Sequence, residues 1–187
     1  MTQHDAELVR CICGTGRVLL LIGPSSVGKT TIARELQRSL PGAWLLAGVD
    51  LFWGMLDEAK LSDGTFRTDS DVMRRVTRGW HHAVAALAEE GNNVIADELW
   101  THQWWLDDWQ DVLNGITWWP VMLTARAEVL AVREAHRGDR PAGLAQFDHA
   151  RPVDPADFDL VLDTSDLTAA ESATAIANFI QQPRLES

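Results

Sequence analysis

The sequence contains no tyrosine and only two cysteines, and it carries little basic charge. Cys11 and Cys13 are separated by one residue, which matches neither the C-x-x-C spacing of redox motifs nor a paired zinc half-site. His4 could join them as a metal ligand, but a leader segment beside a strand explains all three residues more simply. This sparse use of cysteine favours a reducing, cytoplasmic location.

Long hydrophobic runs are also missing. The longest one near the start, Val18 to Ile22, spans five residues, whereas a helix needs about 20 apolar residues to cross a membrane. We therefore expect no membrane anchor and no secretion signal.

Basic residues are outnumbered, with 16 Lys and Arg against 27 Asp and Glu, which gives a formal net charge of −11. This balance repels nucleic-acid backbones and anionic membrane surfaces, so we expect neither as a partner. A small anion such as a nucleotide can still bind where backbone N–H groups and a few cations gather. The charge therefore disfavours polymers and leaves nucleotides open.

The length of 187 residues and the hydrophobic fraction of 46% fit one well-cored domain covering residues 1–187. Apolar segments typical of buried strands alternate with segments whose apolar residues recur at helical spacing. This alternation predicts an α/β fold in which a five-stranded parallel sheet is covered by helices on both faces. The expected strands are Arg17 to Ile22, Ala43 to Val49, Val94 to Ala96, Ile116 to Leu123 and Asp159 to Leu162, and the expected helices are Thr31 to Leu40, Val72 to Glu90, Glu128 to His136 and Ala169 to Ile180, with a partly helical stretch from Trp100 to Leu113.

Three segments fall outside this alternation. Residues 1–16 are polar and are interpreted as a leader, and residues 57–71 are polar with a central glycine, which predicts a mobile loop that could serve as a lid. Residues 137–152 follow an arginine-rich helix end and predict an arginine lid. Ligands of parallel sheets bind at the carboxyl ends of the strands, where we expect the functional residues to gather.

The first strand leads into a glycine loop, Gly23-Pro24-Ser25-Ser26-Val27-Gly28-Lys29-Thr30, which matches the phosphate-binding pattern G-x-x-x-x-G-K-[ST]. Glycines let backbone N–H groups turn inward around phosphate oxygens, and the N-terminus of the following helix adds its positive dipole. Lys29 is expected to reach the β- and γ-phosphates, and Thr30 to offer its hydroxyl to Mg²⁺. An ordinary strand-to-helix turn is the alternative. The expected nucleotide-binding residues are Gly23, Ser25, Ser26, Val27, Gly28, Lys29, Thr30 and Thr31.

Acidic residues follow the second and third expected strands. Asp50 could accept a proton from an acceptor hydroxyl aligned with the γ-phosphate, or it could cap the helix starting at Leu51. Asp97 suits the acidic group that holds magnesium through water, or it could cap the next helix, and Glu98 could share the magnesium task. We expect Asp50, Asp97 and Glu98 to be substrate-binding residues.

Three arginines lie within eight residues, at Arg133, Arg137 and Arg140. Arg133 and Arg137 are four residues apart and so share one helix face, while Gly138 lets the chain leave the helix. Guanidinium groups in such a position can neutralise the charge that develops on a transferring phosphoryl group. The alternative is a solvated helix end whose cations favour the C-terminal dipole.

Nine tryptophans are the dominant aromatic residues. The spacing of Trp100, Trp104 and Trp105 suits one helix face, so packing in the core is the default interpretation. The functional alternative is that some of these tryptophans, including Trp100, line a flat apolar acceptor pocket together with Trp53, beside Asp50.

Together, these motifs resemble those of the chloramphenicol phosphotransferase family, over nearly the whole chain. The resemblance rests on Gly23 to Thr30, Gly48-Val49-Asp50, Asp97-Glu98, Arg133 to Arg140 and Asp159 to Thr164. It implies a P-loop kinase architecture similar to that of shikimate kinase. Asp50 matches the family's proposed general base, Lys29 and Thr30 its phosphate loop, and Arg133, Arg137 and Arg140 its lid arginines.

The activity that this resemblance implies is Mg²⁺-dependent transfer of the γ-phosphate of ATP or GTP to a hydroxyl of a small antibiotic, giving resistance or self-resistance. Kinases of capuramycin-type nucleoside antibiotics fit equally well, since a large, partly flat acceptor suits more tryptophan. Two other classes share the nucleotide residues. One is a kinase with a cellular metabolite or nucleotide as acceptor, and the other is an ATPase or switch that acts through a protein partner.

Overall fold

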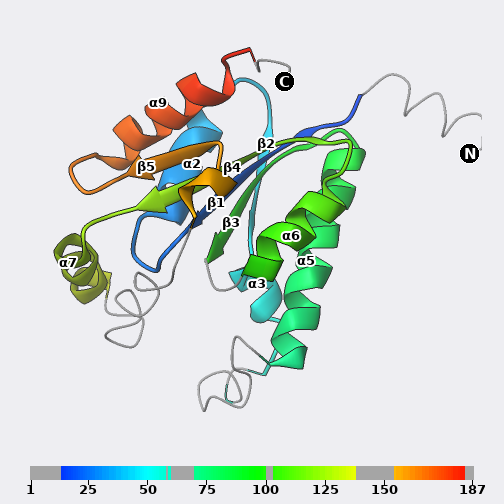
Figure 1. Ribbon diagram of the computed structural model, residues 1–187, viewed down its shortest axis with the longest axis horizontal. Coiled ribbons are helices and arrows are strands. Elements are labelled where there is room, and N and C mark those ends of the chain that lie inside the picture. Colours follow the sequence, from blue (N-terminus) through cyan, green and yellow to red (C-terminus); the bar gives the residue numbers. More distant parts are fainter. Residues whose placement is uncertain (1–13, 58, 60–69, 100–102, 138–153, 184–187) are drawn as a thin grey trace, which may run out of the picture.

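Five parallel strands form the centre of the protein, in the order β2-β3-β1-β4-β5 (Figure 1). The computed structural model describes residues 14–57, 59, 70–99, 103–137 and 154–183, except for the side chain of Arg137. The strands are β1 (Arg17–Gly23), β2 (Trp44–Gly48), β3 (Asn93–Leu99), β4 (Thr117–Thr124) and β5 (Leu160–Asp163). The helices are α2 (Lys29–Ser39), α3 (Asp50–Trp53), α5 (Asp71–Glu89), α6 (Gln103–Val112), α7 (Ala127–Arg137) and α9 (Ala169–Ile180), with a 3₁₀ turn at Pro155–Asp157.

The predicted fold class is confirmed, because the sheet has five parallel strands and helices on both faces. The main difference concerns β3, which the sequence predicts only at Val94 to Ala96. In the structure Asp97, Glu98 and Leu99 continue the strand and pair with Leu21, Ile22 and Gly23 of β1. Charged residues can extend a buried strand here because both carboxylates find hydrogen-bond partners.

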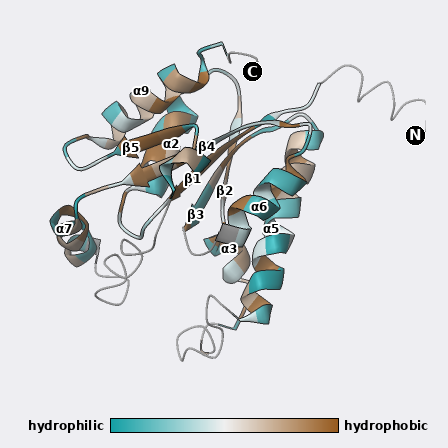
Figure 2. Cartoon of the chain, in the orientation of Figure 1, coloured by the Kyte–Doolittle hydropathy of each residue, from teal (hydrophilic) through white to brown (hydrophobic). Residues whose placement is uncertain are grey.

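Side chains alternate between two cores, one on each face of the sheet. Leu19 and Leu21 of β1 pack with Leu36 of α2 and Ile176 of α9, whereas Leu20 faces the other way. That second face is covered by α5 and α6, which contribute Trp80, Val84, Leu106 and Trp109. The strands accordingly form the most hydrophobic layer, while α5 exposes a hydrophilic side (Figure 2).

Most of the described tryptophans pack in the interior. Trp80, Trp105 and Trp109 are almost completely buried, and Trp44 and Trp119 are 5% and 6% exposed. The predicted core packing is therefore confirmed for Trp105. Trp53, Trp104 and Trp118 are only partly buried, and Trp100 lies outside the described residues.

The helices of the described part of the chain include none with the length and apolar composition of a membrane span. The leader at 1–16 is described only for its last three residues, and most of 57–71 and of 137–152 lies outside the described ranges. The single domain, the mobile loop and the arginine lid stay predictions.

Two leucines test the layered core. Leu36 is completely buried between α2 and the sheet, whereas Leu87 on α5 is 38% exposed. We expect Leu36→Ala to lower the free energy of unfolding by about 2–5 kcal/mol, because it leaves a cavity among close-packed side chains. Leu87→Ala should cost far less. Denaturant unfolding of both variants measures the difference, and equal losses would contradict the described packing.

Candidate active site

The phosphate loop is held at the carboxyl end of the central strand β1. Gly23 has no room for a side chain, since an added Cβ would lie 2.4 Å from the backbone oxygen of Leu123 on β4. Gly28 precedes α2 with a φ of 105°, and Ser26 has a φ of 63°. The first turn of α2 receives no side-chain cap and contains no acidic residue. Its N–H groups and positive dipole therefore face the loop, as anion binding requires.

Lys29 folds back over this loop. Its ammonium group donates hydrogen bonds of 2.9 Å to the backbone oxygens of Gly23 and Pro24, and the residue is 8% exposed. The Ser26 hydroxyl is buried and has no hydrogen-bond partner among the described residues. A loop with a buried cation and an unsatisfied hydroxyl has the donors that phosphate oxygens need.

Thr30 and Asp97 meet between the loop and the neighbouring strand. The Thr30 hydroxyl donates to a carboxylate oxygen of Asp97 at 2.5 Å. Asp97 lies inside β3 and is 9% exposed. It does not cap a helix, because the strand continues for two more residues.

Asp50 begins α3 directly after β2. The N-cap position belongs to Val49, and no side chain caps the helix, so the alternative role of Asp50 as a helix cap is not supported. The backbone N–H of Val49 donates to the backbone oxygen of Asp97, which ties the start of α3 to β3. Asp50 is exposed, and it lies at the same carboxyl edge of the sheet as the phosphate loop, where both line one cavity.

Arg133 reaches from α7 to the phosphate loop. Its guanidinium donates to the backbone oxygen of Val27 at 3.2 Å, to the hydroxyl of Thr164 at 3.1 Å and to the backbone oxygen of Thr164 at 2.7 Å. The Thr164 hydroxyl also contacts the Val27 oxygen at 3.1 Å. In this structure Arg133 therefore joins the loop to the end of β5. Arg140 and the side chain of Arg137 lie outside the described residues.

These elements surround a cavity of about 590 Å³, a size typical of small-molecule sites. The phosphate loop forms its middle. One end is lined by Gly48, Val49, Asp50, Asp97 and Leu99, and the other by Arg133, His136, Thr164, Leu167, Ala169 and Ser172. Lys29, Arg34 and Arg133 bring positive charge to the lining, so the cavity suits an anion although the whole protein is strongly acidic.

The sequence did not single out Arg34 as a cavity residue. It follows Thr30 by four residues on α2 and so lies on the same helix face, which was the available signal. Trp53 is placed next to the cavity by α3 but does not line it. Trp100 lies outside the described residues.

Glu98 is not brought to the cavity. It is completely buried on the opposite face of β3, where one carboxylate oxygen contacts His81 Nε2 at 3.2 Å and the other accepts from Trp109 Nε1 at 2.6 Å. His81 Nδ1 in turn contacts Asp108 at 2.6 Å. Strand alternation explains the result, since neighbouring residues of a strand point to opposite faces. Sharing a cation with Asp97 is incompatible with this position.

The pKa values in this buried group follow from its contacts. Burial alone lowers the pKa of His81, but hydrogen bonds to Asp108 and Glu98 outweigh it and raise the value above 6.5. Burial raises the pKa of Glu98 despite its contacts with His81 and Trp109. Burial also acts to raise the pKa of Asp108, but His81 and Arg78 lower it overall. Both ring nitrogens of His81 contact carboxylate oxygens, and these contacts favour the imidazolium form of His81 and the ionised form of Asp108.

A protein-family comparison identifies the relationship. The family model described as chloramphenicol phosphotransferase-like protein matches residues 16–181. The chain belongs to this family. A Mycobacterium tuberculosis protein, present in two strains and named as a predicted O-phosphotransferase, is 31% identical to the present chain. The match covers 89% of the present chain and 83% of the Mycobacterium protein. The protein is therefore a phosphotransferase of the P-loop kinase type.

Solved structures confirm the fold of this phosphotransferase. A sugar kinase from Janibacter superposes with a TM-score of 0.68 at 22% identity, covering 88% of this chain and 94% of that one. The APS kinase of Mycobacterium tuberculosis, solved with AMPPNP and APS, gives 0.67 at 18% identity, with 90% and 99% covered. The tunicamycin resistance protein of Deinococcus radiodurans gives 0.64 at 20% identity, with 88% and 96% covered.

The contacts of Arg133 lead to a first prediction for the site. Arg133→Met keeps the unbranched apolar part of the side chain but removes the guanidinium that donates to Val27 and Thr164. We expect the free energy of unfolding to fall by about 1–3 kcal/mol, because two backbone oxygens lose a charged donor. Nucleotide affinity should fall with it, measured by titration calorimetry.

Arg126→Met serves as the control, because Arg126 pairs with Asp166 on the exposed surface, where solvent screens the interaction. If Arg133→Met bound nucleotide normally and lost only turnover, Arg133 would act on the transferring phosphoryl group and not as a clamp on the loop.

The raised pKa of His81 predicts a pH dependence. Protonation of His81 is favoured by folding, so its stabilising effect is fully present below pH 6.5 and is lost as the pH rises through the raised folded pKa. The free energy of unfolding should therefore decline above pH 6.5 more steeply in the wild type than in His81→Gln. Denaturant unfolding at a series of pH values measures this, and parallel curves for the two proteins would be inconsistent with a charged His81.

Proposed function

We propose that the protein transfers the γ-phosphate of ATP or GTP to a hydroxyl group of a small antibiotic, with Mg²⁺ as the cofactor. The observation that carries the proposal is the cavity, which has the phosphate loop in its middle and Asp50 at one end. A kinase needs room for a nucleotide on one side of the γ-phosphate and for an acceptor on the other. This cavity extends in both directions from the loop.

The nucleoside would lie at the end formed by α7 and the start of α9. β5 is the outermost strand on that side of β1, and the residues after it line the cavity together with Arg133 and His136. The loop N–H groups and Lys29 would hold the β- and γ-phosphates, so the contacts between Lys29 and the loop oxygens would be exchanged for contacts to phosphate.

Thr30 and Asp97 fit a magnesium ion that is held mainly by phosphate oxygens and water. The described residues include no group of three or more His, Cys, Asp or Glu side chains arranged as a metal site. Mg²⁺ in phosphoryl-transfer sites commonly uses one or two protein oxygens, and the Thr30 hydroxyl and Asp97 carboxylate meet beside the loop. When bound, the ion would neutralise charge on the β- and γ-phosphates.

Asp50 would act at the acceptor end. Its carboxylate would accept the proton of the attacking hydroxyl while the hydroxyl oxygen forms a bond to the γ-phosphorus. The bond from that phosphorus to the oxygen bridging it to the β-phosphate breaks, and the nucleoside diphosphate leaves. Arg137 and Arg140 would neutralise charge on the transferring group from the proposed lid.

An antibiotic acceptor is supported by the family description and by the aromatic residues beside Asp50. Trp53 is the last residue of α3, and the centre of its ring lies 6.3 Å from that of Trp105 in an edge-on arrangement. A partly exposed Trp104 follows at 5.6 Å from Trp105. We include Trp53 and Trp100 in the acceptor site, which would suit chloramphenicol-like or capuramycin-type nucleoside acceptors.

The test is a panel of hydroxyl-bearing compounds incubated with protein, Mg²⁺ and ATP or GTP, and analysed by mass spectrometry. The panel contains chloramphenicol, uridine-based nucleoside antibiotics, and common sugars and nucleosides. We expect an antibiotic to gain one phosphate group, and Lys29→Ala to abolish the gain. Phosphorylation confined to the sugars or cellular nucleosides would replace the antibiotic acceptor by a metabolite.

Replacement of Asp50 is the sharpest mutational prediction. Asp50→Asn should lower kcat by a factor of about 10²–10⁴, because the acceptor hydroxyl loses its base and its anchor. Nucleotide affinity should stay unchanged, since Asp50 lies at the acceptor end. The matched control is Asp57→Asn, which changes a nearby carboxylate that does not line the cavity. Equal turnover of Asp50→Asn and wild type would remove Asp50 from the mechanism.

A further inference from the structure

Behind the cavity, on the other face of β3, a buried polar network connects the strand to two helices. Glu98 of β3 contacts His81 of α5 and Trp109 of α6. His81 contacts Asp108 of α6, and Arg78 of α5 donates to the other oxygen of Asp108 at 2.8 Å. Glu98 and His81 are both completely buried. Each oxygen of Glu98 therefore has one hydrogen-bond partner, and the network joins the strand to both helices.

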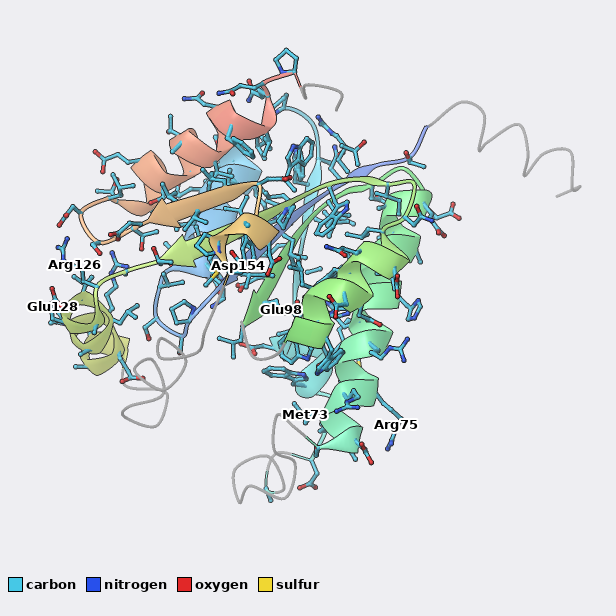
Figure 3. The ribbon with its side chains drawn as sticks, in the orientation of Figure 1. Met73, Arg75, Glu98, Arg126, Glu128 and Asp154 are labelled. Atoms are coloured by element: carbon cyan, nitrogen blue, oxygen red, sulfur yellow. The ribbon has the colours of Figure 1, made fainter. Side chains whose placement is uncertain are left out.

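The network lies directly beside a residue of the active site. Asp97 and Glu98 are neighbours on β3, with Asp97 directed to the phosphate loop and Glu98 to α5 and α6. Figure 3 shows Glu98 at the end of β3 next to α6. A displacement of Glu98 would move the backbone of Asp97 as well, and the Asp97 backbone oxygen accepts from Val49 just before Asp50.

The network also reaches the acceptor end through α5. Thr77 lies one turn before His81, is completely buried, and accepts a hydrogen bond from Trp53 Nε1 at 3.2 Å. Trp53 is the last residue of α3, and Asp50 is the first. The position of α5 therefore determines where α3 and its carboxylate can lie.

We propose that Glu98 and His81 are positioning residues, and that their buried network holds α3, with Asp50 and Trp53, in place for the acceptor. Apolar side chains could fill the same space, but they would leave α5 and α6 free to slide. Hydrogen bonds between the two carboxylate oxygens of Glu98 and side chains of two helices fix both direction and distance. This inference rests on the proposed acceptor site beside Asp50.

Two substitutions of Glu98 separate this role from others. Glu98→Gln can preserve the network, because its amide oxygen accepts from Trp109 and its NH₂ group donates to neutral His81, whose Nδ1–H still donates to Asp108. Glu98→Leu has a similar size but loses both links. We expect kcat/KM for the acceptor to fall about 10–100-fold in Glu98→Leu, as small misplacements of reacting groups do. Glu98→Gln should retain it, and neither variant should change the nucleotide Kd measured without Mg²⁺, because Asp97 would act on the nucleotide only through the ion.

A matched control measures general destabilisation. Leu113 is buried in the same core but follows α6 at the opposite edge of the sheet. Leu113→Ala should lower the melting temperature without changing kcat/KM for the acceptor. The proposal is overturned if Leu113→Ala and Glu98→Leu lose kcat/KM in proportion to their melting temperatures. It is equally overturned if Glu98→Gln loses as much activity as Glu98→Leu, since the carboxylate charge itself would then be needed.

Hydrogen exchange keeps this test independent of the acceptor. The N–H groups of Phe52, Trp53 and Gly54 form hydrogen bonds within α3. We expect faster exchange at residues 50–56 in Glu98→Leu, and unchanged exchange in Glu98→Gln and Leu113→Ala. If no compound is phosphorylated by the wild type, the proposed function fails, and this pattern still supports the network. Equal exchange in all variants would overturn the inference even if an acceptor is found.

Discussion

The pairing of β1 with a parallel strand on each side is the constraint on which the site depends. It places the phosphate loop at the middle of the sheet's carboxyl edge, between the ends of β3 and β4. Close contact with β4 requires glycine at position 23. Because the loop is central, the cavity can extend toward β2 and α3 on one side and toward β5 and α9 on the other. The fold thereby leaves room for a ligand on each side of the phosphate loop.

β3 separates two kinds of polar chemistry by the alternation of its side chains. Asp97 contacts Thr30 on the cavity side, whereas Glu98 is buried among His81 and Trp109 on the other. A buried carboxylate is costly unless it is paired and hydrogen-bonded, and here both conditions are met. In the proposed function, one short strand end would thus supply a group for the nucleotide side and an anchor for the helices that support the acceptor side.

The sequence was informative where chemistry and local pattern coincide. The phosphate loop could be predicted because glycines, Lys29 and Thr30 have fixed spacing, and the strands because their apolar runs are continuous. The end of β3 could not, because Asp97 and Glu98 look like loop residues until their partners are known. Those partners lie 67 and 17 residues away in the sequence. The loop contact of Arg133 joins residues that are 106 apart, and no local pattern reveals such a pair.

The proposed roles of the site residues all depend on transfer of the γ-phosphate to a small-molecule hydroxyl. The most direct measurement follows a radiolabelled γ-phosphate of ATP or GTP in the presence of Mg²⁺ and an antibiotic acceptor. We expect the label to appear on the acceptor in proportion to the nucleoside diphosphate formed. Label released only as inorganic phosphate, at a rate that does not change with any acceptor, would exclude this transfer and identify the protein as a nucleotide hydrolase.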